Sequence, residues 1–344
     1  MNTQMLKTLG RVAAVSLAAL SLASGSAVAQ QAGAPFTIQI DGSSTVFPIS
    51  EAVAEGFQQQ TSGRVRVTVG ESGTGGGFRK FCRGETHISD ASRPISQGEM
   101  ATCAAAGVQY IEIPVAFDAL TVVVNPNNPL RSITIEELRR IWEPGAQGRI
   151  TNFNQVNPAW ANQPLQLFGP GTSSGTFDYF TEAVNGRARA SRSDYTPSED
   201  DNVIVQGVAS NAGGMGYFGL AYYEENRSRL RALAIDSGNG PVEPSVANTV
   251  NGTYSPLSRP IFIYVSAAAL RRPQVQQFVQ YYINNAASVS QRVGYVPLPA
   301  AAYQTYLQRV QRRQAGTAFG GRQAIGITIE QLLQRRLVLT PTSD

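Results

Sequence analysis

LQLFGPGTSSGTFDYFTEAV (Leu165–Val184) predicts a strand, a loop and the start of a helix. Its first four residues have strand-like character, and apolar residues recur at helical spacing after the loop. The first N–H groups of a helix lack partners and carry partial positive charge, so Ser173, Ser174 and Thr176 beside them are suited to hold an oxyanion. Taken alone, the loop is better explained as a helix cap, because Ser and Thr are ordinary capping residues.

The same pattern occurs at two earlier places in the chain. Phe36–Ile40 precedes the loop DGSST, and Val65–Val69 precedes the loop GESGTGGG; apolar residues at helical spacing follow each loop. A cap uses one hydroxyl, whereas these loops carry several. Their hydroxyl residues are Ser43, Ser44, Thr45, Ser72 and Thr74. Three loops of this kind predict convergence on one small anion.

The first 29 residues have the pattern of an export signal. Lys7 and Arg11 flank the short apolar run Val12–Ala23, which is too brief to span a bilayer. A small-x-small cleavage site, Ala-Val-Ala, ends at Ala29. We therefore expect cleavage after Ala29 and a soluble periplasmic protein, with full secretion as the alternative. No cysteine lies near this site, so a lipid anchor is not predicted.

Length and charge limit the class of protein. Removing 29 residues from 344 leaves 315, which exceeds the size at which one core usually stops growing, so two lobes are expected. The net charge of +4 is too small and too scattered to favour a nucleic-acid ligand.

Cys82 and Cys103 are the only cysteines. An even pair in an exported protein predicts a disulfide, which would contribute about 3 kcal/mol by restricting the unfolded chain. Two buried free thiols are the alternative. No further ligands lie near enough to suggest zinc, so we expect neither a metal nor a cofactor.

Two buried strands organise the rest of the chain. Ala119–Val124 and Ile261–Val265 bracket a central block, and two chain crossings at these strands would form a hinge. This predicts an α/β protein in which residues 30–120 and 260–344 form one lobe and residues 121–259 form the other.

Two helix starts have a specific signature. Thr134-Ile-Glu-Glu137 is a capping box, and the helix it opens is expected to end at Pro144-Gly145. Thr328-Ile-Glu-Gln331 is a second box and is expected to open the last helix.

Five segments carry a resemblance to a known family. They are DGSSTVFPI, GESGTGGGFRKFC, ISDASRPIS, GPGTSSGTFDYF and SRSDYTPSEDDNV. They resemble the periplasmic phosphate-binding proteins of bacterial high-affinity phosphate ABC transporters, over about Ile38 to Pro299. The resemblance implies a type II periplasmic-binding-protein fold, with two α/β lobes joined by a two-segment hinge around a ligand cleft. It also implies a monomer that captures inorganic phosphate and delivers it to a membrane permease and ATPase.

The resemblance also implies a set of phosphate-binding groups. They are Ser44, Thr45, the amide of Val46, Ser72, Asp90, Ser92, Ser174, Gly175 and Thr176. One departure concerns the cation, because the enteric type of the family has an arginine where this chain has Pro170. Arg192 is the favoured replacement, and Arg93 is the alternative.

A second departure concerns the group that accepts a hydrogen bond from phosphate. The enteric type has its aspartate two residues before the proline of this turn, where this chain has Ser92. We expect Asp90 to take over the role and to discriminate phosphate from sulfate, which has no proton to donate. The alternative is that Asp90 is only a turn residue. Asp200 and Asp201 would then be the next candidates.

A different class of function is an exported serine hydrolase. Gly171–Gly175 matches the G-x-S-x-G nucleophile elbow, with Ser173 as the nucleophile. Its chemistry needs a general base, and the one histidine of the chain, His87, precedes the serine, whereas that fold orders its triad as Ser, acid, His. We therefore do not expect an enzyme. No Walker loop or dinucleotide fingerprint is present in the sequence.

Overall fold

The structure is a computed structural model that describes residues 35–338. The expected export signal and its cleavage site after Ala29 lie outside the described residues. Within residues 35–338, no helix has both the length and the apolar character that crossing a membrane requires.

A nine-stranded sheet forms the framework, in the order β2-β1-β3-β12-β4-β8-β6-β7, with β9 paired to β4. Its strands are β1 Phe36–Gly42, β2 Val65–Gly70, β3 Ile88–Ala91, β4 Tyr110–Val124, β6 Gln166–Pro170, β7 Thr196–Ser198, β8 Gly214–Gly219, β9 Arg231–Ala232 and β12 Ser258–Ser266. A small second sheet has the order β11-β10-β5. Its strands are β5 Ser132–Thr134, β10 Ala234–Asp236 and β11 Pro241–Val242.

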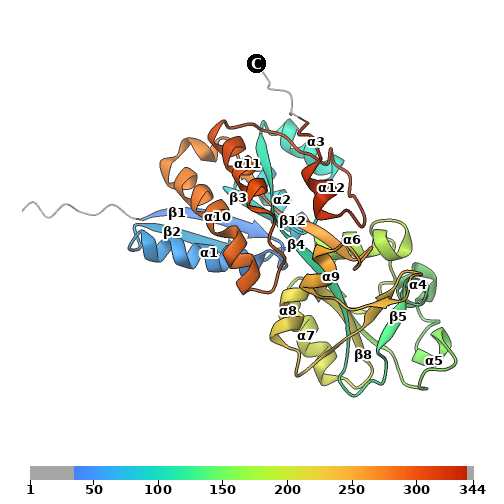
Figure 1. The fold of residues 1–344 in the computed structure, drawn as a ribbon. Coiled ribbons are helices and arrows are strands. Elements are labelled where there is room, and N and C mark those ends of the chain that lie inside the picture. The colour runs from blue at the N-terminus through green and yellow to red at the C-terminus, as the bar shows by residue number, and fades with distance from the viewer. Residues whose placement is uncertain (1–34, 339–344) are drawn as a thin grey trace, which may run out of the picture. The chain divides into compact units, whose positions relative to one another are not determined.

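Helices of two groups pack on these strands. The first group is α1 Phe47–Gln60, α2 Thr74–Cys82, α3 Gln97–Ala105, α10 Pro273–Arg292, α11 Ala300–Gln311 and α12 Ile329–Leu333. The second group is α4 Ile135–Trp142, α5 Phe153–Val156, α6 Gly175–Asn185, α7 Asp201–Ser210, α8 Leu220–Glu225 and α9 Val246–Val250, while 3-10 turns occupy Pro144–Ala146 and Ala269–Arg271. Figure 1 shows the blue helix α1 beside the orange helix α10, so distant parts of the chain pack together.

The apolar residues form two main cores. One core draws on residues 38–117 and 261–332, with Ala221 added, and the other lies within residues 119–257. We call the parts built around them lobe 1 and lobe 2. Strand β4 is buried along its whole length and belongs to both, because its first part pairs with β12 and its last part pairs with β8. The chain passes between the cores at residues 117–119 and again at 257–261.

The expected local signals are found where the sequence predicted them. Helices α1, α2 and α6 each follow a strand and a hydroxyl-rich loop. Both predicted capping boxes are formed, at Thr134 and at Thr328. A third box, Ser96 with Glu99, opens α3 and was not predicted. The Cys82–Cys103 disulfide is present and joins the end of α2 to α3.

The segment that follows α11 links the two lobes. On the lobe 1 side, Gly316 pairs with Ile111 of β4. On the lobe 2 side, Gln323 donates from Nε2 to Glu182 Oε2 at 2.7 Å, and the Gly326 amide donates to the Tyr179 hydroxyl at 3.0 Å. The chain therefore connects the lobes here in addition to the two strand crossings.

Candidate anion-binding site

The three hydroxyl-rich loops meet at the junction of the lobes. Thr45 of lobe 1 and Thr176 of lobe 2 share a hydrogen bond, with 3.0 Å between their Oγ1 atoms. The Gly75 amide of lobe 1 donates to the Ser173 carbonyl of lobe 2 at 2.7 Å. The loops therefore lie next to one another and bring together helix starts from both lobes. Their convergence on an anion stays a prediction.

The loop before α6 approaches lobe 1 so closely that only glycine fits at position 175. A Cβ atom on Gly175 would lie 2.5 Å from Thr74 Oγ1 and 2.7 Å from Ser92 Oγ. These two hydroxyls also contact each other at 3.2 Å, and the Ser92 amide donates to Thr74 Oγ1 at 3.0 Å. Ser92 and Gly175 of the predicted set thus lie side by side.

Helix capping explains only one of the loops. Ser174 caps α6, since its hydroxyl accepts from the Thr176 amide at 3.1 Å. At the starts of α1 and α2 the N-cap residues are Val46 and Gly73, and neither helix has a side-chain cap. The hydroxyls of these loops are therefore not explained by capping, which favours the oxyanion interpretation.

A buried cation at the junction, Arg259, was missed by the sequence interpretation. It is fully buried on β12, between the residues that belong to the two cores. Its Nη2 donates to Thr176 Oγ1 at 2.9 Å and to Asp118 Oδ2 at 2.9 Å, and its Nε donates to the same Asp118 oxygen at 3.2 Å. The guanidinium therefore places positive charge against the start of α6. Asp118 lies directly opposite Arg259 in the β4–β12 pairing.

A sequence signal for this pair existed. Asp118 interrupts the buried strand of residues 110–124, and Arg259 stands at the start of another buried strand. A charged residue in a buried strand needs a partner, because burial of an unpaired charge is very costly. The register that pairs the two strands is not visible in either segment alone.

The structure does not support Arg192 as the cation of the site. Its guanidinium donates to both Asp194 carboxylate oxygens, at 2.6 and 2.9 Å, and to the carbonyls of Ile141 and Ile150 at 3.1 and 3.0 Å. These partners all belong to lobe 2. The hydrogen bonds from Arg192 hold the pKa of Asp194 at about 2. Arg192 therefore stabilises the interior of lobe 2, and its bonds are already used.

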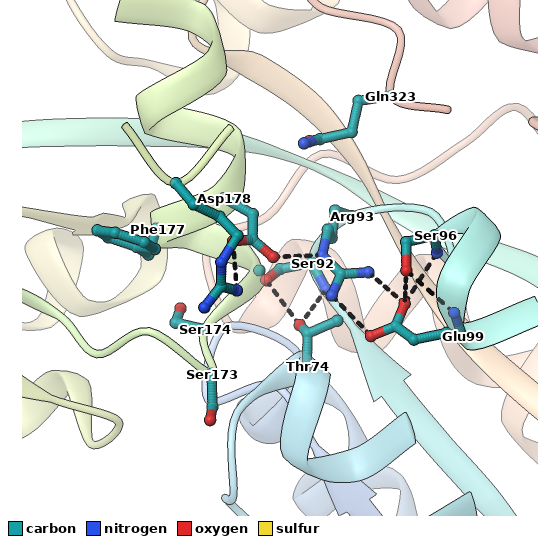
Figure 2. Close-up of polar contacts among 12 residues, drawn as sticks. Thr74, Ser92, Arg93, Ser96, Glu99, Ser173, Ser174, Phe177, Asp178 and Gln323 are labelled. Carbon is teal, nitrogen blue, oxygen red and sulfur yellow. Dashed lines mark hydrogen bonds and ion pairs between the residues drawn. The ribbon is translucent and has the colours of Figure 1, made fainter. Parts of the chain in front are cut away.

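The alternative cation, Arg93, is also engaged. Figure 2 shows it between two carboxylates: its Nε donates to Asp178 of α6 at 2.8 Å, and its Nη1 and Nη2 donate to Glu99 of α3 at 2.8 Å each. Asp178 also lies 3.3 Å from Arg189 Nη1. Arg93 is thus an ion-pair link between the lobes beside the site.

The backbone of Asp90 adjoins the first hydroxyl-rich loop, since its carbonyl accepts from the Ser43 amide at 3.0 Å. Its side chain is fully buried inside lobe 1, near Ser50 of α1 and Tyr282 of α10, which bond each other at 3.0 Å. Burial raises the pKa of Asp90 to about 8; the Ser50 hydroxyl partly offsets this, and the charge of Asp41 adds to it. This placement does not support Asp90 as the acceptor for a bound anion.

The Ser72 hydroxyl also bonds to a group within lobe 1 rather than to one at the junction. It donates to Asp41 at the end of β1, and Lys80 Nζ donates to the other oxygen of that carboxylate at 2.6 Å. Ser72 is therefore part of a polar cluster within lobe 1. Its predicted contact with the ligand finds no support in this arrangement.

Ser173 has no histidine beside it. Its hydroxyl accepts from Arg79 Nη2 at 3.2 Å, and its amide donates to Glu199 at 3.0 Å. His87, the one histidine of the chain, accepts from the Gln39 amide with Nδ1 at 3.0 Å and packs on Phe36. The nucleophile elbow therefore lacks the histidine base that the hydrolase interpretation requires.

Comparison with known proteins identifies the family. The sequence model of the PBP superfamily domain matches residues 27–286. Protein SphX of Synechococcus elongatus is 51% identical over 331 residues, which are 96% of this chain and 98% of that protein. Phosphate-binding protein PstS of Staphylococcus saprophyticus is 36% identical over 268 residues, 76% of this chain and 81% of that protein.

Two solved structures agree. A possible phosphate binding protein from Planctomyces limnophilus is 46% identical, with a TM-score of 0.60 over 81% of this chain and 98% of that one. A putative phosphate ABC transporter substrate-binding protein from Clostridium perfringens, with bound phosphate, is 23% identical and shares the fold, with a TM-score of 0.65 over 76% of this chain and 100% of that one. The fold is that of a type II periplasmic binding protein. The chain belongs to the PBP superfamily, in the family that includes SphX and PstS.

Proposed function

We propose that this protein captures inorganic phosphate in the periplasm and delivers it, as a monomer, to the permease and ATPase of an ABC transporter. The observation that carries the proposal is the meeting of three hydroxyl-rich helix starts and a buried arginine between two cores. Hydroxyls, helix-start N–H groups and a guanidinium are the donors that a tetrahedral oxyanion requires. The names of the relatives and the predicted export signal support phosphate as the ligand and the periplasm as the location.

The binding set that we propose differs from the sequence expectation in three positions. The donors are Ser44, Thr45, the amide of Val46, Ser92, Ser174, Gly175, Thr176 and Arg259. Arg259 replaces Arg192, while Ser72 and Asp90 are left out because each has its surroundings within lobe 1. The lobes, with the expected boundaries 30–120 with 260–344 and 121–259, close on the anion around the strand crossings of β4 and β12.

Isothermal titration of the chain starting at Gln30 with phosphate, arsenate and sulfate tests the proposal. Thr176→Val removes a junction hydroxyl and retains the side-chain shape, and Thr305→Val does the same on the exposed face of α11. A hydrogen bond to a charged group contributes about 1.5–3 kcal/mol, so Thr176→Val should weaken phosphate binding about 10- to 150-fold, whereas Thr305→Val should not. Thermal melting of each variant confirms that it is folded.

The same preparation separates the proposal from the hydrolase. An absence of phosphate binding by the folded wild-type protein would overturn the proposed function. Hydrolysis of a p-nitrophenyl ester that Ser173→Ala abolishes would instead support the hydrolase interpretation.

A further inference from the structure

Arg93 and Asp178 form an ion pair that joins the lobes beside the hydroxyl-rich loops (Figure 2). Arg93 Nε of lobe 1 donates to Asp178 Oδ2 of lobe 2 at 2.8 Å, and the two residues are only 6% and 5% exposed. Arg93 directly follows Ser92, and Asp178 lies two residues after Thr176 in the first turn of α6. The pair is therefore positioned by the same two chain segments that carry hydroxyls of the junction.

Arg93 has a second carboxylate partner within its own lobe. Its Nη1 and Nη2 donate to the two carboxylate oxygens of Glu99 at 2.8 Å each. Glu99 is itself held in place, because its Oε2 accepts from the amide and the hydroxyl of Ser96 at 2.8 Å each in the capping box of α3. The guanidinium also lies over the ring of Phe78 of α2, with Cζ 5.8 Å from the ring centroid. Contacts within lobe 1 thus hold Arg93 and pair its charge.

Asp178 likewise has a cation within lobe 2. Its Oδ1 lies 3.3 Å from Arg189 Nη1, which also donates to the Thr172 carbonyl at 3.0 Å. The Arg189 amide donates to Thr181 Oγ1 at 2.7 Å, so the backbone holds this arginine next to Asp178. The Arg189 side chain is 58% exposed, and water therefore weakens its attraction to the carboxylate.

Separation of the lobes leaves neither charge of the Arg93–Asp178 pair without a partner. Breaking a buried ion pair is usually very costly, because the remaining charge stays buried without compensation. Here Arg93 retains Glu99 and Asp178 retains Arg189, each within one lobe. The bond between the lobes can therefore break at a much lower cost than an isolated buried pair.

We propose that the Arg93–Asp178 pair is a reversible latch that forms when the lobes close and slows the release of phosphate. The inference rests on the proposed function, because it requires the lobes to close around the anion. In the closed form the pair adds a charge-assisted hydrogen bond between the lobes. In the open form each charge is left with the partner in its own lobe. The latch thus strengthens binding without contacting the ligand.

Release of radiolabelled phosphate into excess unlabelled phosphate tests the latch, together with isothermal titration of the same proteins. Asp178→Asn retains the shape of the side chain and leaves Arg93 paired with Glu99. It should accelerate release and weaken binding about fivefold or more, since a bond that exists only in the closed form acts mainly on the dissociation rate. Loss of a negative charge near a bound anion would by itself strengthen binding, so the expected direction is opposite to that of a simple charge effect.

Two further variants complete the comparison. Arg189→Gln is the matched control, because it removes the partner of Asp178 that belongs to the same lobe, and it should not accelerate release. Arg93→Lys tests the latch from the other lobe, since an ammonium retains a charge for Glu99 but lacks the planar fork that bonds two carboxylates at once. It should accelerate release as Asp178→Asn does, and it takes the place of that variant if Asp178→Asn does not fold.

The outcomes separate the latch from the proposed function. If wild type binds phosphate and both Asp178→Asn and Arg93→Lys release it at the wild-type rate, or bind it more tightly, the latch is wrong and phosphate capture still stands. Equal acceleration by Arg189→Gln would also overturn the latch, because the effect would then not depend on the bond between the lobes. Folded wild type that does not bind phosphate would overturn the proposed function and the latch together.

Discussion

The junction between the lobes and the lobe interiors contain the same kinds of residue. The junction has a buried arginine paired with an aspartate, Arg259 with Asp118, and lobe 2 has Arg192 with Asp194. The junction also has a hydroxyl pair at 3.0 Å, and Ser50 with Tyr282 form one at the same distance in lobe 1.

The difference lies in where the partners come from. Interior partners belong to one lobe, so the group is satisfied by folding alone. Junction groups face residues of both lobes, and Arg259 directs part of its bonding to Thr176 rather than to its carboxylate partner. Residue type therefore does not distinguish the groups at the junction from those inside a lobe, whereas the origin of their partners does.

Replacement of the two arginines should give the largest contrast. Arg259→Met and Arg192→Met each leave a carboxylate unpaired, so each should lower the free energy of unfolding, by about 3–5 kcal/mol where the pair is fully buried. Only Arg259→Met should also lower phosphate affinity, by about a thousandfold or more, measured by titration at a temperature where both variants are folded. Equal affinities in the two variants would remove the distinction between junction and interior. Arg259→Lys retains the charge if the Met variant does not fold.

The carboxylate inside lobe 1 should affect stability through pH. The pKa of Asp90 is raised to about 8 by burial, with Ser50, Asp41 and Tyr282 facing it, and its ordinary value is 3.8. Between these values the folded protein retains a proton that the unfolded chain has lost, so this group's stabilisation is complete below about pH 4 and is lost as the pH rises through 8.

Urea unfolding of wild type and Asp90→Asn checks this expectation. The difference in unfolding free energy, variant minus wild type, should rise by about 1.4 kcal/mol per pH unit, or about 2.7 kcal/mol between pH 5 and pH 7. Phosphate affinity should stay unchanged. Parallel stability curves would show that Asp90 titrates normally, and a loss of affinity would place it in the site after all.

The hydroxyl pairs should give the smallest effect. Ser50→Ala leaves the buried Tyr282 hydroxyl without its partner and should cost about 1 kcal/mol of stability with no change in affinity. Thr45→Val at the junction should weaken phosphate binding about tenfold or more. Titration and thermal melting of both variants measure the two effects. Weakened phosphate binding by Ser50→Ala would contradict the distinction between the hydroxyl pair at the junction and the one inside lobe 1.

Local signals made much of the fold predictable. The strand–loop–helix units that end at α1, α2 and α6 follow from apolar periodicity and from hydroxyl-rich loops. The box at Thr134 and the Cys82–Cys103 disulfide follow from residue type, spacing and compartment. These features depend on residues close in sequence or on a single available partner.

The polar partners of the site were not predictable in the same way. Asp118 and Arg259 are 141 residues apart and meet only through the register of β4 on β12. The loop that carries Ser72 predicts ligand binding, yet the Ser72 hydroxyl donates to Asp41 at the end of the neighbouring strand. Arg192 bonds to Asp194, two residues along the chain, because the loop conformation turns both side chains toward each other. Strand register and side-chain direction decide which of these polar groups become partners, and neither is visible in the sequence.

The chain segment after α11 restricts how far the cleft can move. Two strand crossings alone would act as a simple hinge. The segment after α11 adds a third connection, because Gln323 and Gly326 bond to Glu182 and Tyr179 of α6. Any rotation that moves α6 away from lobe 1 must either break these two hydrogen bonds or move the segment together with α6. Opening of the cleft at α6 is therefore coupled to the position of this segment as well as to the two strand crossings.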